Sequence, residues 1–165
     1  MTVSVLELAA LARAVPRGTR LLGIDVGTRT LGLALSDATW TIATPVRTLA
    51  RTRLAADLRT LSGLVGDLDA GGFIVGLPVQ MDGREGPRCQ SVRQFVRDLT
   101  RAIDLPAAFW DERLSTAAVE RTLIGEADLG RKRRKHVVDR AAAAWILQGA
   151  LDGLRNFAAE PAPDG

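Results

Sequence analysis

Residues 21–37, with the sequence LLGIDVGTRTLGLALSD, constrain the fold more than any other part of the chain. Two short apolar runs flank a polar bend that contains glycine, a pattern typical of a β-hairpin. The first run ends in a carboxylate, Asp25, which is costly in apolar surroundings unless it is solvated, hydrogen-bonded or bound to a cation. An aspartate that bonds to the backbone of its own turn is the alternative at this position.

The composition fits a globular domain of ordinary size. The chain has 165 residues, which is long enough to bury a hydrophobic core. Of these residues, 47% are hydrophobic and 25% are charged, as is usual for globular proteins. No apolar run approaches the roughly 20 residues that cross a bilayer, and residues 1–18 lack the pattern of a secretory signal. The one cysteine, Cys89, excludes an internal disulfide. We therefore expect a cytoplasmic protein without membrane association.

Strand and helix patterns alternate along the rest of the chain. Parallel strands need helical crossovers, so this order predicts an α/β fold: an antiparallel three-strand meander plus two parallel strands, with helices on both faces of the sheet. After the hairpin, the predicted elements are a strand over 41–49, a helix over 52–68, a strand over 73–78, a helix over 87–101, a strand over 107–112, a short helix over 116–125 and a buried helix over 137–154.

The two ends of the chain differ from its centre. Residues 1–18 are interrupted by Pro16 and Gly18, and we expect a flexible, loosely attached extension with a short helix over 4–14. Residues 156–165 are rich in proline and small residues, and we expect a disordered tail there. Residues 19–155 would then form one domain.

Three carboxylates are expected to meet at one edge of the sheet. Asp25 ends the first predicted strand and Glu112 the fifth, and sheets of this kind bind ligands at the carboxyl ends of their strands. Asp139 lies in the first turn of the last predicted helix, on or beside its apolar face. A favourable interaction with the helix dipole is the alternative explanation for Asp139.

Carboxylates that converge raise one another's pKa, so this cluster needs a compensating positive charge. Oxygen ligands suit Mg²⁺ or Mn²⁺. Two such ions, about 4 Å apart, would activate a water and stabilise the leaving oxygen of a phosphodiester. The sequence therefore predicts a metal-dependent hydrolytic site at Asp25, Glu112 and Asp139.

Basic residues surround the predicted cluster, within a chain of net charge +3 that permits nucleic-acid binding without demanding it. Arg29 and Arg113 follow two of the carboxylates and are candidates to contact phosphates or to neutralise the site. His136 fits a surface or phosphate contact better than metal ligation. A basic run just ahead of Asp139 suits a phosphate backbone, or else is a solvated helix end. It consists of Arg131, Lys132, Arg133, Arg134 and Lys135.

Four segments of the chain together resemble the motifs of one protein family. They are GIDVGTRTLGLALSD, VGLPVQMDGREGPR, WDERLST and VDRAAAAWILQ, within residues 20–154. They resemble the YqgF/RuvX family, whose members are described as pre-16S rRNA nucleases or Holliday junction resolvases of the RNase H-like superfamily. The resemblance implies a five-stranded mixed sheet with a central first strand, and it places the family's acidic residues on Asp25, Glu112 and Asp139.

The resemblance also implies a function: a nuclease on structured nucleic acid, with processing of the 5′ end of pre-16S rRNA preferred to Holliday junction resolution. The implied partners are pre-rRNA or branched DNA and the ribosome, and a homodimer is compatible with the second activity. Two other classes stay open. An actin-like or sugar-kinase ATPase uses a similar glycine-bearing hairpin for phosphate, although such proteins pair two domains. A non-catalytic module that docks on the ribosome is the third possibility.

Overall fold

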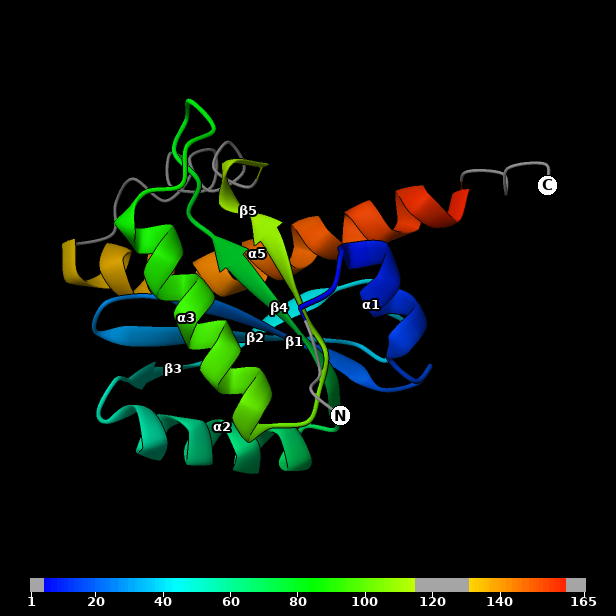
Figure 1. The fold of residues 1–165 in the computed structure, drawn as a ribbon, viewed down its shortest axis with the longest axis horizontal. Helices are drawn as coiled ribbons and strands as arrows, with labels where there is room; N and C mark the ends of the chain where they lie inside the picture. Colours follow the sequence, from blue (N-terminus) through cyan, green and yellow to red (C-terminus); the bar gives the residue numbers. More distant parts are fainter. Residues whose placement is uncertain (1–4, 115–130, 160–165) are drawn as a thin grey trace.

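A computed structural model gives the fold over residues 5–114 and 131–159, with side chains described over 5–114 and 141–156. In this part of the chain, five strands form one mixed sheet in the order β3-β2-β1-β4-β5 (Figure 1). The predicted sheet is thus confirmed, with the first strand at its centre. The strands are β1 (Arg20–Val26), β2 (Thr30–Ser36), β3 (Ala43–Ala50), β4 (Ala70–Leu77) and β5 (Ala107–Asp111).

The pairing of the strands follows the predicted order of elements. Strands β1, β2 and β3 are antiparallel neighbours, whereas β4 and β5 run parallel to β1. The β1–β2 hairpin places Asp25 opposite Gly32. At the outer edge, β3 contains Pro45, and the register of β2 and β3 shifts at this point.

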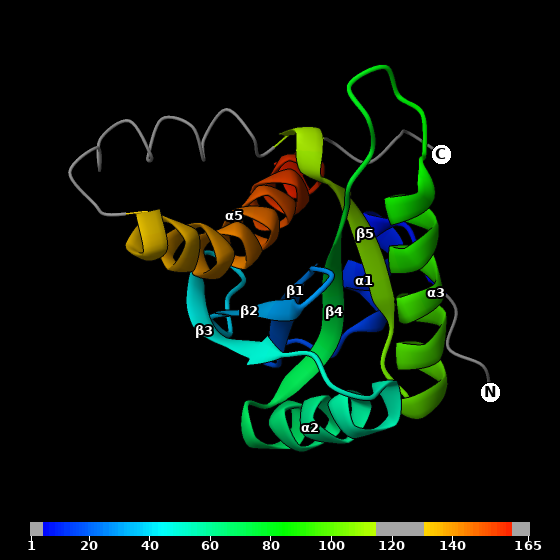
Figure 2. The ribbon, with the colours of Figure 1, turned by 90° about the vertical axis from the view of Figure 1, so that its left-hand side faces the viewer.

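Helices cover both faces of the sheet, as predicted (Figure 2). Two hydrophobic cores result: one lies between the sheet and α2 and α3, and the other between the sheet and α1 and α5. None of the helices in the described residues is long and apolar enough to cross a membrane. The helices are α1 (Leu8–Ala14), α2 (Leu54–Asp67), α3 (Pro87–Ala102), the short 3₁₀ helix η1 (Glu112–Leu114) and α5 (Arg131–Ala159).

Strand β1 contributes alternate side chains to the two cores, because successive residues of a strand point to opposite faces. Leu22 and Ile24 belong to the core beneath α2 and α3. Leu21 belongs to the core beneath α5. Gly23 and Asp25 follow Leu21 at intervals of two residues and share its face of the strand. The carboxylate of Asp25 therefore lies on the side of the sheet that α5 covers.

The N-terminal segment differs from the expected loose attachment. Leu11 and Val15 are only 0% and 3% exposed, and both belong to the core beneath α5. The backbone N–H of Leu6 donates to the carbonyl of Ala107 at 2.8 Å, and Val5 pairs with the same residue of β5. Residues 5–15 are therefore packed on the sheet, because the apolar side chains of α1 share one buried face.

The last helix is longer than predicted at both ends. Helix α5 begins at Arg131 and not at residue 137, so the basic run is helical, and the helix continues through Ala159 into the predicted disordered tail. Arginine and lysine are good helix formers, which explains the earlier start. The predicted helix over 116–125 lies outside the described residues.

Gly23 allows the closest approach between β1 and α5. A Cβ atom at this position would lie 2.8 Å from the Cβ of Leu147 and 3.2 Å from the carbonyl oxygen of Ala143. Both contacts are shorter than packed side chains tolerate, so any larger residue would push the helix away from the sheet.

We therefore expect Gly23→Ala to lower the free energy of unfolding by about 1–3 kcal/mol, as overpacking of a core does. Gly63→Ala is the matched control, because Gly63 lies within α2 and a Cβ there would meet no atom within 4 Å. That change should be neutral or stabilise the protein by up to about 1 kcal/mol. Urea unfolding of the two variants measures the difference, and equal stabilities would contradict the close approach.

Candidate active site

Asp25 of β1 and Glu112 meet at the carboxyl end of the sheet, although Glu112 is the first residue of η1, directly after β5, and not the last residue of that strand as predicted. Strand β4 lies between β1 and β5. The side chain of Glu112 crosses β4 over Gly76, where a Cβ atom would lie 2.5 Å from Glu112 Oε1 and 2.5 Å from Cδ1 of Ile146. Glycine at this position therefore leaves the space through which the two carboxyl groups make contact.

The two carboxyl groups hydrogen-bond to each other, which requires one of them to carry a proton. Burial raises the pKa of Glu112 to about 7, and the negative charge and hydrogen bond of Asp25 add to this rise. Glu112 is thus the group of the pair that holds the proton near neutral pH. A nearby positive charge would lower the pKa values of both carboxyl groups.

Arg88 is a residue near the site that the sequence analysis missed. It follows Pro87, which opens α3, and its positive charge opposes the rise in the pKa of Glu112. Arg88 is exposed and is the last residue of the motif VGLPVQMDGREGPR. Its place in this motif is the sequence feature that could have identified it. The neighbouring Cys89 is buried, and this burial raises the pKa of its thiol. Arg88 is therefore an additional candidate for phosphate binding, whereas Cys89 is a packing residue.

The two predicted arginines beside the carboxylates have different environments. Arg113 forms an ion pair with Asp111, with Nη2 and Oδ2 separated by 2.6 Å, and its Nη1 lies 3.5 Å from the carbonyl of Gln80. Arg113 thereby connects β5 with the loop that follows β4. Arg29 is exposed in the β1–β2 turn, and its carbonyl accepts the N–H of Arg51 at 2.8 Å. The Arg29 side chain is available to a ligand.

The structure places Asp139 in α5, about two turns after the helix begins at Arg131 and not in its first turn as predicted, so the helix-dipole explanation does not apply. Ala143, Ile146 and Leu147 are at most 3% exposed and form the buried stripe of the helix. Position 139 continues this stripe by one turn, because residues four apart share a helix face. The side chain of Asp139, and those of Arg131, Lys132, Arg133, Arg134, Lys135 and His136, lie outside the described residues, so their roles stay predictions.

The described carboxyl groups supply part of a binding site for a hard divalent cation. Within the described side chains there is no group of three or more His, Cys, Asp or Glu residues that could hold a metal ion. The pair of Asp25 and Glu112 supplies two of the three predicted ligands, both with the carboxylate oxygens that Mg²⁺ and Mn²⁺ prefer. Asp139 is the predicted third.

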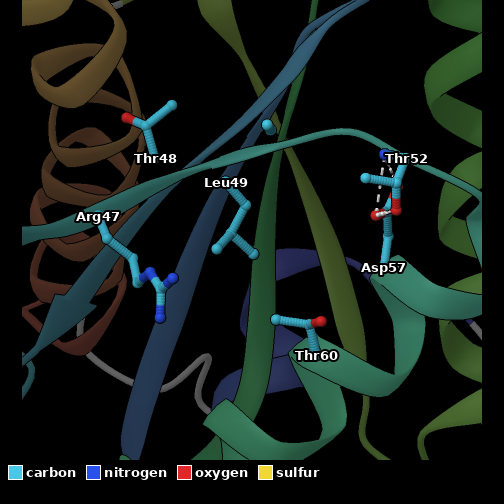
Figure 3. Close-up of a pocket in the computed structure, with 7 residues that line it drawn as sticks. Arg47, Thr48, Leu49, Thr52, Asp57 and Thr60 are labelled. Atoms are coloured by element: carbon cyan, nitrogen blue, oxygen red, sulfur yellow. Dashed lines mark hydrogen bonds between the residues drawn. The ribbon is translucent and has the colours of Figure 1, made fainter.

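A separate pocket of about 270 Å³ lies between β3 and α2 and contains none of the predicted site residues (Figure 3). Asp57 in this pocket accepts the hydroxyl of Thr52 at 2.8 Å and its N–H at 3.1 and 3.2 Å. These bonds fix the first turn of α2. The carboxylate of Asp57 thus has a structural role, and we assign no chemistry to this pocket.

A family model and individual relatives point to the same protein family. The model of the family described as RuvX, Holliday junction resolvase, matches residues 19–153. A protein of Rhodospirillum rubrum named "Putative pre-16S rRNA nuclease" is 55% identical over 150 residues, which cover 91% of this chain and 93% of the relative. A protein of the same name from Paramagnetospirillum magneticum is also 55% identical, over 93% of this chain and 99% of the relative.

Solved structures with a similar arrangement include Thermus thermophilus RuvC in complex with a Holliday junction substrate. Its sequence is 17% identical to this chain, and the two structures have a TM-score of 0.49. The match covers 78% of this chain and 91% of the RuvC chain.

The raised pKa of Glu112 predicts a distinctive pH dependence of stability. Between its unfolded pKa of 4.5 and its folded pKa of about 7, the native protein binds more protons than the unfolded chain, so stability falls as the pH rises. Without divalent cations, Glu112→Gln should raise the free energy of unfolding at pH 8 by about 1–2 kcal/mol, a value reduced for partial exposure. At pH 4 the difference from the natural protein should be close to zero.

Asp111→Asn is the matched control, because the ion pair with Arg113 lowers the pKa of Asp111. That carboxylate stabilises the fold above its unfolded pKa, and this contribution is lost as the pH falls. The control should therefore reduce stability at pH 8. Denaturant unfolding at both pH values tests the pair, and a loss of stability in Glu112→Gln at pH 8 would contradict the assignment.

Proposed function

Because the chain belongs to the RuvX family, we propose that it is a metal-dependent nuclease that hydrolyses phosphodiester bonds of structured nucleic acid. Processing of the 5′ end of pre-16S rRNA is the preferred activity, supported by relatives named for it that are 50–55% identical. Holliday junction resolution is the second candidate, supported by the description of the family. The observation that carries the proposal is the proton-sharing pair Asp25 and Glu112.

Asp25, Glu112 and Asp139 are the proposed ligands of Mg²⁺ or Mn²⁺, with two ions in the site. When bound, these ions supply positive charge that lowers the pKa of a water and stabilises negative charge on phosphate oxygens. The protein's own contribution is to hold the carboxyl groups in place. Glu112 reaches Asp25 only because position 76 carries no side chain. A bound cation would favour the ionised form of Glu112, so that Asp25 and Glu112 would both present carboxylate oxygens to it.

Arginine and lysine residues around the site are proposed to bind the phosphate backbone. Arg29 is exposed at the hairpin turn and Arg88 is exposed at the start of α3. Arg113 is fixed by Asp111 in a geometry that presents part of its guanidinium group beside the loop after β4. The basic run in the first turns of α5 is proposed to contact the same phosphate backbone: Arg131, Lys132, Arg133, Arg134 and Lys135.

The proposed function implies particular partners and a location. A nuclease acting on pre-16S rRNA works in the cytoplasm and meets the ribosome or its precursors. The second activity would add a homodimer, because a resolvase cuts two symmetric strands. The substrate therefore determines which assembly is required.

Asp25→Asn should abolish cleavage while leaving folding nearly intact, because it removes a metal ligand and keeps the shape of the side chain. The measurement incubates the natural protein and the variant with Mg²⁺ or Mn²⁺, in parallel with a pre-16S rRNA fragment and a four-way DNA junction. The preferred substrate distinguishes the two candidate activities.

Three results would contradict the nuclease proposal. Cleavage that persists in Asp25→Asn would remove the carboxyl pair from the chemistry. Hydrolysis of ATP without cleavage of nucleic acid would favour an actin-like ATPase. Binding of RNA without cleavage by the natural protein, unchanged when all three carboxylates are replaced, would favour a non-catalytic module that docks on the ribosome.

Replacing Arg133 and Arg134 with alanine should weaken nucleic-acid binding and reduce the slope of log K against log salt by about 2, one for each lost phosphate contact. The matched control replaces Arg59 and Arg101, which are exposed on α2 and α3 and produce the same change in net charge. Binding titrations at several salt concentrations measure both pairs. Equal slopes would show that the basic run does not contact the backbone.

A further inference from the structure

A second cavity, of about 750 Å³, lies at the opposite end of the sheet from the carboxyl pair. It is lined by α1, the turn after α1, the loop between β2 and β3, and the end of α5. That loop follows the carboxyl end of β2, and β2 is antiparallel to β1, so it lies beside the start of β1. Figure 1 shows α1 beside the C-terminal part of α5, and residues of both helices line the cavity.

Trp40 is held rigidly in the wall of the cavity. Its backbone has a φ of 56°, a left-handed conformation that a bulky residue rarely adopts without compensating contacts. The indole Nε1 donates to the carbonyl of Thr19 at 2.7 Å. The carboxylate of Asp37 accepts the N–H groups of Thr41 and Ile42 at 2.7 and 3.0 Å, which fixes the loop. The ring therefore needs no further ordering to receive a ligand.

All the charged side chains that line the cavity are arginines. Arg13 and Arg17 line it, are exposed, and form no ion pair within the described residues. Arg155 lines it as well and is paired with Asp152. A ligand that matches this wall has an aromatic plane for the indole and a negative group for the two free guanidinium groups.

We propose that this cavity binds a nucleotide, with the base against Trp40 and the phosphate between Arg13 and Arg17. The volume is within the range of about 300–1,000 Å³ that is usual for ligand sites. Stacking of a base on an aromatic side chain contributes about 1–3 kcal/mol and tolerates any base. The nucleotide is either free in solution or part of a single strand, since both present the same chemistry.

The cavity is distinct from the proposed catalytic site. Thr19, which holds Trp40, precedes Asp25 by six residues of extended chain, or about 20 Å. Arg13, Arg17 and Arg155 fall outside residues 19–153, the part of the chain that the family model matches. The cavity is thus built largely from segments that flank the shared domain, and its ligand binding is separable from cleavage.

The test compares the double variant Arg13→Ala, Arg17→Ala with the control Arg59→Ala, Arg101→Ala, which changes the net charge equally on the opposite layer. Binding of adenosine monophosphate and of a short single-stranded oligoadenylate RNA is titrated without divalent cations, so that cleavage plays no part. We expect the first variant to bind about tenfold more weakly and the control to bind as the natural protein does. The probe that binds identifies whether the nucleotide is free or in a strand.

Tryptophan fluorescence tests the role of the ring independently. Nucleotide binding should quench the emission of the natural protein, and most of this change should be lost in Trp40→Phe, which keeps an aromatic ring and retains binding. Three outcomes would overturn the proposal: equal weakening in both double variants, competition by poly-glutamate as strong as by the RNA, or quenching that persists in Trp40→Phe.

Discussion

The contact between Asp25 and Glu112 is the constraint on which the rest of the site depends. Asp25 belongs to β1 and Glu112 directly follows β5, so their carboxyl groups can meet only if β4, the strand between, carries no side chain at that point. Gly76 meets this condition. The same face of the sheet must also accept α5 at close range, which Gly23 allows. Two glycines on two adjacent strands therefore determine how near the acidic groups, the sheet and the last helix can come.

This arrangement places opposing demands on the protein. A half-buried pair of acids is unfavourable when both are ionised, so the free site holds a proton near neutral pH, and Glu112 carries it. The fold tolerates the pair because the strands and α5 are anchored by apolar residues on both faces. Structural stability is thus supplied by the two cores, and the edge of the sheet is left available for charged groups.

Local sequence patterns predicted the five strands and the two crossover helices, and they singled out Asp25 and Glu112, which the structure places in contact. The hairpin, the crossover helices and the central position of β1 follow from periodicity and from the order of elements. Contacts between distant segments were not accessible in this way. The packing of α1 on β5, the effect of Arg88 on Glu112 and the passage of Glu112 over Gly76 each depend on residues far apart in the chain, which no local pattern reports.

The two outer strands of the sheet are protected in different ways. On β3, Pro45 lacks an N–H donor and the register shifts beside it. On β5, the segment around Val5 and Leu6 already occupies the backbone of Ala107. In the described part of the chain, each border is thus interrupted at one point, which disfavours addition of another strand there. A second copy of this chain that approached either edge of the sheet would therefore find the regular row of backbone partners interrupted at Pro45 and at Ala107.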